Sequence, residues 1–335
     1  MSVLVAGGAG YIGSVTVERL SRAGHKVVIY DNLSRGHAEA VPAHIPFVKG
    51  DLADTQLLEK TFREHKVDSV MHFCAHSLVA ESVREPLMYY QNNVQNGLNL
   101  LGAMLRCDVK QFIFSSSAAV FGEPQTVPIT EDASRCPTNP YGRTKAMFET
   151  ILRDCSEAHG LRSISLRYFN ACGATETCGE EHNPETHLIP IVLEVALGKR
   201  EALGVFGRDY PTPDGTCIRD YIHVADLADA HIRALEALAK GAATTVYNLG
   251  NGHGFSVLEV AQAAEEITCR KIATIDAPRR PGDPARLVAS SDRIREELHW
   301  HPQITDLRRI IETAWKWKLQ HPNGYASTKA AERAQ

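Results

Sequence analysis

Our prediction of the fold starts from the stretch Val3-Leu4-Val5-Ala6-Gly7-Gly8-Ala9-Gly10-Tyr11-Ile12-Gly13. Its apolar beginning predicts a buried strand, and residues 11–23 have the apolar spacing of a helix. The glycines at positions 7, 10 and 13 lie at the turn between the two. Glycine there allows a tight turn, close approach of the backbone to a pyrophosphate, and close packing of the helix on the sheet. The stretch therefore predicts a dinucleotide-binding loop, although glycine-rich turns of this kind also occur for packing alone.

An acidic residue strengthens this prediction. A second strand is predicted at residues 26–30, and Asp31 follows it, about 20 residues after the loop, where a carboxylate binds the adenosine ribose and repels a 2′-phosphate. NAD is therefore favoured over NADP. Arg35 argues the other way, since an arginine nearby can bind a 2′-phosphate. Asp51 follows the third strand where an adenine ring would lie, and an ordinary turn aspartate fits that place equally well.

Repeated strand–helix units of this length predict an α/β fold. They require a Rossmann-like, doubly wound parallel sheet covered by helices on both faces. We expect an NAD-binding domain at residues 1–170, to which residues of about 220–250 return, and a smaller α+β substrate-binding domain at 171–323. The polar, alanine-rich tail at 324–335 is expected to fray. In the first domain the strands are predicted at residues 3–5, 26–30, 46–48, 67–73, 111–115 and 163–166, and the helices at 11–23, 55–64, 86–105 and 141–159.

The pattern is looser after residue 160. Residues 188–197 and 224–238 are expected to be helical, whereas residues 204–220 are expected to be irregular. Ser256 with Glu259 three positions later predicts a capping box at the start of a further helix.

Composition narrows the classes of function. The 335 residues are 44% hydrophobic and 23% charged with a net charge of −4, and they contain no basic block, so neither nucleic acid nor a membrane is an expected partner. No apolar run approaches the roughly 20 residues of a membrane span, and no basic leader precedes the first strand. The eight cysteines are scattered without a CxxC pair, which indicates free thiols in a reducing cytoplasm.

A tyrosine and a lysine form the candidate catalytic pair. Tyr141 and Lys145 lie four residues apart, on one face of a predicted helix. A free phenol is a poor base at neutral pH, and we expect the lysine and the positive nicotinamide of NAD to lower the pKa of the tyrosine. The pattern alone is common on surface helices. Here Ser115-Ser116-Ser117 ends a buried strand, where the ligand crevice of a doubly wound sheet lies, so a serine is expected to hold the reacting hydroxyl or relay its proton.

In this order and spacing the motifs resemble those of UDP-glucose 4-epimerases, members of the extended short-chain dehydrogenase/reductase family. The resemblance extends over residues 2–323. The motifs that carry it are Gly7 to Ser14, Asp31-Asn32-Leu33, Ser115-Ser116-Ser117, Tyr141-Gly142-Arg143-Thr144-Lys145, Arg167-Tyr168-Phe169-Asn170, Arg219-Asp220-Tyr221-Ile222-His223-Val224 and Arg280-Pro281-Gly282-Asp283.

The resemblance implies interconversion of UDP-glucose and UDP-galactose by transient oxidation at C4 of the sugar, with NAD bound throughout. Tyr141 would take the hydroxyl proton, with Lys145 beside it and Ser117 bonded to the same oxygen. Together, the glycine-loop pattern and the resemblance imply a set of NAD contacts. These are Gly7, Gly10, Tyr11, Ile12, Gly13, Asp31, Asn32, Leu33, Ser34, Arg35, Gly36, Asp51, Leu52, Phe73, Cys74, Ala75, Ser77, Asn92, Ser115, Tyr141, Lys145, Tyr168 and Phe169. It implies substrate contacts at Ser117, Tyr141, Asn170, His187, Leu188, Leu203, Val205, Phe206, Arg219, Tyr221, Arg280 and Asp283. It also implies a homodimer through the helices at 86–105 and 141–159.

Several alternatives remain at this stage. A 4,6-dehydratase needs an acid–base pair directly after the strand-end serines, and Ala118-Ala119 cannot transfer protons. Epimerases of UDP-glucuronate, UDP-pentoses or UDP-GlcNAc stay open, partly because residues 284–288 are hard to align with relatives. A non-catalytic NAD-sensing protein is the alternative from another class. His182 and His187 suggest a metal site only weakly, without an HExxH motif or a cysteine partner, so no metal is predicted.

Overall fold

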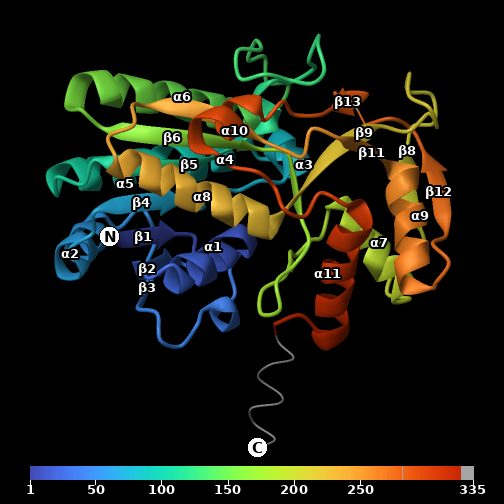
Figure 1. The fold of residues 1–335 in the computed structure, drawn as a ribbon, viewed down its shortest axis with the longest axis horizontal. Coiled ribbons are helices and arrows are strands. Elements are labelled where there is room, and N and C mark those ends of the chain that lie inside the picture. The colour runs from blue at the N-terminus through green and yellow to red at the C-terminus, as the bar shows by residue number, and fades with distance from the viewer. Residues whose placement is uncertain (281, 326–335) are drawn as a thin grey trace, which may run out of the picture.

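The computed structural model describes residues 1–280 and 282–325; Pro281, which belongs to one of the quoted motifs, lies outside this range. Seven parallel strands form the main sheet in the order β10-β6-β5-β4-β1-β2-β3 (Figure 1). The order reverses between β1 and β4, which confirms the predicted doubly wound fold. The strands are β1 (Ser2–Ala6), β2 (Lys26–Asp31), β3 (Phe47–Lys49), β4 (Ser69–His72), β5 (Gln111–Ser117), β6 (Arg162–Tyr168) and β10 (Thr245–Leu249).

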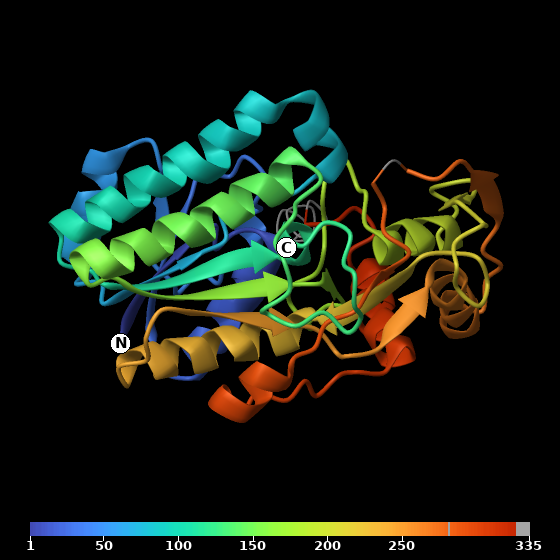
Figure 2. The same cartoon turned by 90° about the horizontal axis from the view of Figure 1, so that it is seen from above.

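Alternation along the strands gives the sheet two apolar faces. In β1, Val3 and Val5 pack into one core, and Leu4 and Ala6 pack into the other. The first core is covered by α1 (Tyr11–Arg22) and α8 (Val224–Ala239). The second is covered by α2 (Thr55–His65), α5 (Asn96–Arg106) and α6 (Pro140–His159). Figure 2 shows α5 and α6 side by side over one face and α8 below the other.

The stretch predicted as one helix at 86–105 is not continuous. It comprises α4 (Pro86–Tyr90), a π-helical turn η2 (Gln91–Gln95) and α5, and it follows an unpredicted short helix, α3 (Val79–Arg84). The π-helical turn carries Asn93, which is 3% exposed. Its amide nitrogen donates to the His76 carbonyl at 3.0 Å and to the Thr144 hydroxyl at 3.1 Å. The turn therefore ties the segment after β4 to the helix that carries the candidate catalytic pair.

The smaller region builds two further sheets. One holds β7 (Asn170–Cys172), β9 (Ile218–His223), β11 (Gly254–Ser256) and β13 (Arg286–Leu287), and the other pairs β8 (Leu203–Phe206) with β12 (Thr274–Ala277). The stretch expected to be irregular thus contains strand residues. Helices α7 (Leu188–Ala196), α9 (Val257–Thr268) and α11 (Leu307–Gln320) share one apolar cluster, seen at the right of Figure 1. The remaining elements are η1 (Ala38–Ala40), η3 (Ala118–Val120) and α10 (Asp292–Leu298).

Two local predictions for this region have opposite outcomes. The capping box is confirmed, because the Ser256 hydroxyl accepts from Glu259 N at 3.0 Å and Ser256 N donates to the Glu259 carboxylate at 2.6 Å. Fraying from residue 324 is wrong for Tyr325, which is 4% exposed and donates its backbone N–H to Glu181 at 2.6 Å. Residues 326–335 of the predicted tail lie outside the described range. Within that range no helix has the length and apolarity needed to cross a membrane.

Candidate active site

The glycine loop joins β1 to α1 in the way that the sequence predicts. Gly7 has φ +82°, and a Cβ on it would lie 2.8 Å from the backbone carbon of Phe73. A Cβ on Gly13 would collide with the Gly7 carbonyl. The N-cap of α1 is Gly10, so no side chain covers the N–H groups of the first turn. The loop is therefore shaped for close approach of an anionic group to a helix N-terminus.

Asp31, at the end of β2, holds the loop in place. One carboxylate oxygen accepts from Ala9 N at 3.0 Å and the other from Leu33 N at 2.8 Å. Burial raises the pKa of Asp31, and these two hydrogen bonds oppose the rise. The carboxylate thus shapes the glycine loop and the turn after β2, beside the position expected for an adenosine ribose.

Arg35 does not present a free positive charge to this site. Its guanidinium lies 3.0 Å from the Glu81 carboxylate and donates to the Asn183 carbonyl at 3.0 Å. An arginine already paired with an acidic residue is poorly placed to receive a 2′-phosphate. The objection to NAD that the sequence raised is thereby weakened.

A cavity lies over the glycine loop at the carboxyl ends of β1, β2 and β4. Thirteen predicted cofactor residues line it: Gly7, Gly10, Asp31, Asn32, Ser34, Arg35, Gly36, Asp51, Leu52, Phe73, Cys74, Ala75 and Asn92. Gly50, His76 and Asn96 line it as well and were absent from the predicted set. The dinucleotide is an elongated ligand, and the residues that line this cavity are those expected at its adenosine end and phosphates. The predicted residues that do not line it are Tyr11, Ile12, Gly13, Leu33, Ser77, Ser115, Tyr141, Lys145, Tyr168 and Phe169.

The catalytic pair lies on the first turns of α6. Asn139 caps this helix by accepting from Gly142 N at 2.9 Å. A Cβ on Gly142 would collide with the Ala119 carbonyl, so the helix packs directly on the segment that follows β5. Tyr141 is therefore brought to the end of β5. Burial raises the pKa of Tyr141, and a hydrogen bond with the Ser117 hydroxyl opposes the rise.

Lys145 is 3% exposed, and its ammonium donates to the Ser115 carbonyl at 2.6 Å. Burial lowers the pKa of Lys145 to about 7. The ammonium lies 5.8 Å from the centroid of the Tyr141 ring. The expected lowering of the tyrosine pKa by this lysine is not found in the protein itself, because desolvation of the phenol dominates and the lysine is bound to the strand end.

The three strand-end serines have different environments. Ser115 lies next to Lys145 and Ser117 next to Tyr141, whereas Ser116 points to the opposite face and donates to Glu149 at 2.6 Å. Glu149 also forms an ion pair with Arg167 at 2.7 Å, in which both side chains are at most 3% exposed. Ser116 therefore belongs to a buried polar network that supports β5, β6 and α6, and the other two serines face the reacting groups.

A second cavity lies beside the start of α7. It is lined by Asn170, Ala171, Cys172, His187, Leu188, Ile189, Pro190 and Tyr221, of which Asn170, His187, Leu188 and Tyr221 were predicted to bind substrate. Four other predicted substrate residues form two pairs. Arg219 forms an ion pair with Asp283 at 2.6 Å, and the guanidinium of Arg280 lies 3.8 Å from the centre of the Phe206 ring.

Two predicted substrate residues do not present their side chains to a ligand. Leu203 and Val205 are 2% and 0% exposed, because alternate residues of β8 turn into the core, where Leu203 joins the cluster of α7 and α9. Their side chains serve packing, and the opposite face of β8 carries Phe206.

A sequence model of the NAD dependent epimerase/dehydratase family matches residues 3–250 of this chain. The chain belongs to this family. A UDP-glucose 4-epimerase from Halalkalibacterium halodurans is 51% identical over 329 residues, which cover 98% of each chain. The crystal structure of UDP-glucose 4-epimerase from Brucella ovis in complex with NAD is 46% identical, with a TM-score of 0.92 and coverage of 94% of this chain and 97% of that one. The structure from Bifidobacterium longum in complex with NAD+ and UDP is 39% identical, with a TM-score of 0.92 and coverage of 97% and 100%.

Proposed function

We propose that this protein is an epimerase that interconverts UDP-glucose and UDP-galactose by transient oxidation at C4 of the sugar, with NAD bound. The observation that carries the proposal is the placement of Tyr141, Lys145 and Ser117 at the end of β5, on the edge of the sheet that bears the dinucleotide cavity. Relatives of about half identical sequence over nearly the whole chain carry the name UDP-glucose 4-epimerase, which supports the assignment.

The residues of the chain perform the proton transfer. The Tyr141 oxygen takes the proton of the sugar's 4-hydroxyl, and the Ser117 hydroxyl, already within reach of the phenol, bonds to the same oxygen. Lys145, held by Ser115, supplies a nearby positive charge once protonated. Bound NAD would supply the hydride acceptor and donor for C4 of the sugar, and its positive nicotinamide would favour the phenolate form of Tyr141. Tyr141 is partly buried, which limits the access of water to this exchange.

A division of labour between the two regions follows. We assign cofactor binding to residues 1–170 together with α8 and β10, and substrate binding mainly to residues 171–323. Arg219 and Arg280 are the candidate diphosphate ligands, because guanidinium groups bind phosphate oxygens bidentately. The guanidinium of Arg280 lies over the Phe206 ring, whereas a diphosphate would have to compete with Asp283 for the guanidinium of Arg219, as a 2′-phosphate would with Glu81 for Arg35.

The competing dehydratase chemistry lacks its residues here. Ala118 and Ala119 follow Ser117 and begin η3, and Ala118 is 7% exposed. Methyl groups cannot protonate or deprotonate a sugar carbon or hydroxyl. The oxidised sugar is therefore expected to return to the alcohol rather than lose water.

The test is incubation of the purified protein with UDP-galactose in the absence of added NAD, with UDP-glucose measured over time. Conversion with cofactor that copurifies is the expected result. Turnover of UDP-GlcNAc, a UDP-pentose or UDP-glucuronate instead would overturn the choice of sugar and leave the mechanism in place. Absence of turnover with every UDP-sugar would favour a non-catalytic NAD-sensing role.

We further propose a cytoplasmic homodimer. All eight cysteines are free thiols, which suits a reducing compartment. Leu87, Leu98 and Met147, on α4, α5 and α6, are 81%, 40% and 45% exposed, and apolar side chains on neighbouring helices suit an interface. Light scattering after gel filtration tests the dimer, and a monomeric mass at micromolar concentration would contradict it.

A further inference from the structure

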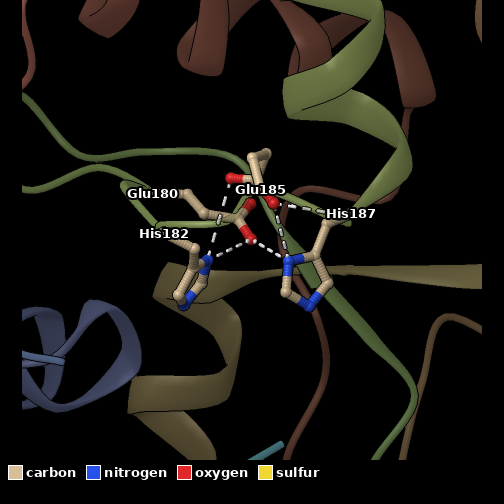
Figure 3. A group of neighbouring side chains, drawn as sticks. All are labelled: Glu180, His182, Glu185 and His187. Carbon is tan, nitrogen blue, oxygen red and sulfur yellow. Dashed lines mark hydrogen bonds and ion pairs between the residues drawn. The ribbon is translucent and has the colours of Figure 1, made fainter. Parts of the chain in front are cut away.

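Four side chains that could bind a metal ion lie close together in the segment that leads into α7, away from Tyr141, Lys145 and Ser117. They are Glu180, His182, Glu185 and His187, and their ligand atoms all lie within 4.8 Å of one another. Figure 3 shows both imidazole rings turned toward the two carboxylates. The cluster does not match the HExxH motif, in which the ligands lie on one face of a helix. Its residues have the spacing E-x-H-x-x-E-x-H and lie in an irregular loop.

The distances suit a common central ion. His187 Nδ1 lies 2.9 Å from Glu180 and 3.0 Å from Glu185, and His182 Nδ1 lies 3.1 Å from Glu180 and 3.8 Å from Glu185. Ligands about 2.1 Å from a tetrahedral ion are separated by about 3.4 Å, which is the middle of this range.

Hydrogen bonding between the four groups leaves atoms unsatisfied. Glu185 Oε2 and His182 Nδ1 are both buried and face each other at 3.8 Å, but neither makes a hydrogen bond of acceptable geometry. A single N–H at His187 Nδ1 faces two carboxylates at the same time. Buried polar atoms of native proteins normally have partners, so unpartnered atoms that converge on one point indicate a missing ligand.

We propose that Glu180, His182, Glu185 and His187 bind one divalent transition-metal ion, with Zn²⁺ as the best match. Two imidazole nitrogens and two carboxylate oxygens are ligands of Zn²⁺, whereas Mg²⁺ and Ca²⁺ prefer oxygen alone. Two carboxylates balance the charge of the ion when the histidines are neutral. Four protein ligands make the site closed, and a closed site has a structural role.

Neighbouring contacts indicate what the ion would stabilise. The backbone N–H groups of Thr186 and His187 donate to Glu185 at 2.8 and 2.9 Å and so orient its carboxylate. On one side of the cluster, the Asn183 carbonyl accepts from Arg35 of the dinucleotide cavity. On the other side, His187 precedes α7 and lines the second cavity. A bound ion would therefore fix the loop that connects the two cavities.

The competing interpretation is a metal-free set of ion pairs. Burial would lower the pKa of His182, but its contacts with Glu180 and Glu185 raise it to about 9. Two imidazolium groups would then balance the two carboxylates without an ion. Both interpretations neutralise the negative charges of Glu180 and Glu185, so measurement of bound metal decides between them.

The experiment strips the NAD-loaded full chain with a chelator, adds Zn²⁺, dialyses, and measures retained zinc by elemental analysis and the unfolding temperature. We expect about one equivalent per chain and an unfolding temperature that rises with Zn²⁺ but not with Mg²⁺. The affinity should fall about 100-fold or more in His182→Asn and Glu185→Gln, since loss of an outer-shell partner alone costs 10- to 100-fold. Matched controls that should bind like the wild type are His159→Asn and Glu176→Gln, at exposed positions outside the cluster.

The thiols of Cys136 and Cys269 are exposed and could bind zinc adventitiously, so Co²⁺ loaded into the wild-type protein gives a second measurement that needs no variant. Bands of four-coordinate Co²⁺ without thiolate-to-cobalt absorption would support the cluster. Thiolate absorption, failure of the wild type to retain zinc, or equal retention by His182→Asn and the wild type would each overturn the proposal. None of these outcomes bears on the epimerase assignment.

Discussion

The main sheet and the smaller C-terminal sheets of this protein are stabilised in different ways. In the main sheet, β1 to β6 are connected by successive strand–helix units, and only β10 joins from farther along the chain. A deeply buried ion pair, Arg167 with Glu149, lies between β6 and the helix that covers it. In the smaller region, β8 pairs with β12, about 70 residues later, and some of its ion pairs, such as that of Arg279 with Asp209, lie at the surface. The difference teaches that reacting groups are mounted on the deeply buried sheet, while substrate contacts come from segments assembled over long range.

The largest effect is expected at the reacting tyrosine. Tyr141→Phe should lower kcat by about 10²–10⁴-fold, because the phenol oxygen is the general acid and base. NAD binding should persist, since Tyr141 does not line the dinucleotide cavity. Initial rates with UDP-galactose measure the loss. The matched control is Tyr247→Phe, which removes a phenol on β10 that donates to Glu297 of α10 and should leave turnover nearly normal. A Tyr141→Phe enzyme with wild-type kcat would refute the proposed role.

Breaking the buried ion pair of the main sheet should be nearly as costly. Glu149→Gln keeps the shape and leaves Arg167 with an uncompensated charge at 3% exposure, so we expect a loss of about 3–5 kcal/mol in the free energy of unfolding. Urea denaturation monitored by circular dichroism measures it. A loss below about 1 kcal/mol would mean that the pair is no stronger than a surface contact.

Acid should destabilise the main sheet through His231. Burial lowers the pKa of His231 to about 4, whereas an unfolded histidine titrates near 6.5. Between these values the unfolded chain binds more protons than the folded one, so stability falls as the pH drops from about 6.5 to 4, by roughly 3 kcal/mol in total. His231→Gln should flatten this part of the profile of unfolding free energy against pH. An unchanged slope would locate the acid sensitivity elsewhere, for example at His223, whose pKa is also lowered by burial.

The glycine loop should tolerate no added methyl group. Gly13→Ala would force a Cβ into the Gly7 carbonyl, and the shift required should cost about 1–3 kcal/mol and weaken NAD retention. Gly102→Ala, within α5, is the control, because its Cβ meets only the end of the Arg106 side chain and alanine favours a helix. Equal stability of the two variants would show that the loop can move without loss.

The surface pair of the smaller region should matter least. Asp209→Asn removes the partner of Arg279, and the two side chains are 75% and 42% exposed, so the free energy of unfolding should change by about 0–1 kcal/mol. Thermal unfolding at low and high salt checks this. A change as large as that of Glu149→Gln would remove the contrast between the two regions.

The same contrast explains what the sequence could predict. The main strands and helices have apolar periodicities that local rules recognise, and so does the capping box of Ser256. The strands β7, β9, β11 and β13 have two to six residues each, and their partners are far away in the chain. Local patterns cannot reveal such pairings, so residues 204–220 looked irregular.

The candidate site follows the same division. Residues at the ends of the main strands were found by motif and spacing. The burial of Leu203 and Val205 depends on which face of β8 meets α7 and α9, which no local pattern specifies. Likewise, the sequence does not reveal that Glu180 and Glu185 lie against His182 and His187, because this contact depends on how the loop folds.

Asp31 has a consequence for protein engineering. Changing the cofactor preference of a Rossmann enzyme usually begins with removal of this carboxylate. Here the same carboxylate accepts hydrogen bonds from the backbone N–H groups of Ala9 and Leu33. Arg35 is the residue that could bind the 2′-phosphate of NADP, but its guanidinium forms an ion pair with Glu81. A switch to NADP would therefore require a replacement that still accepts both backbone N–H groups and a second change that releases Arg35. Cofactor choice in this protein is coupled to backbone architecture, and single substitutions should yield weak binders of both dinucleotides.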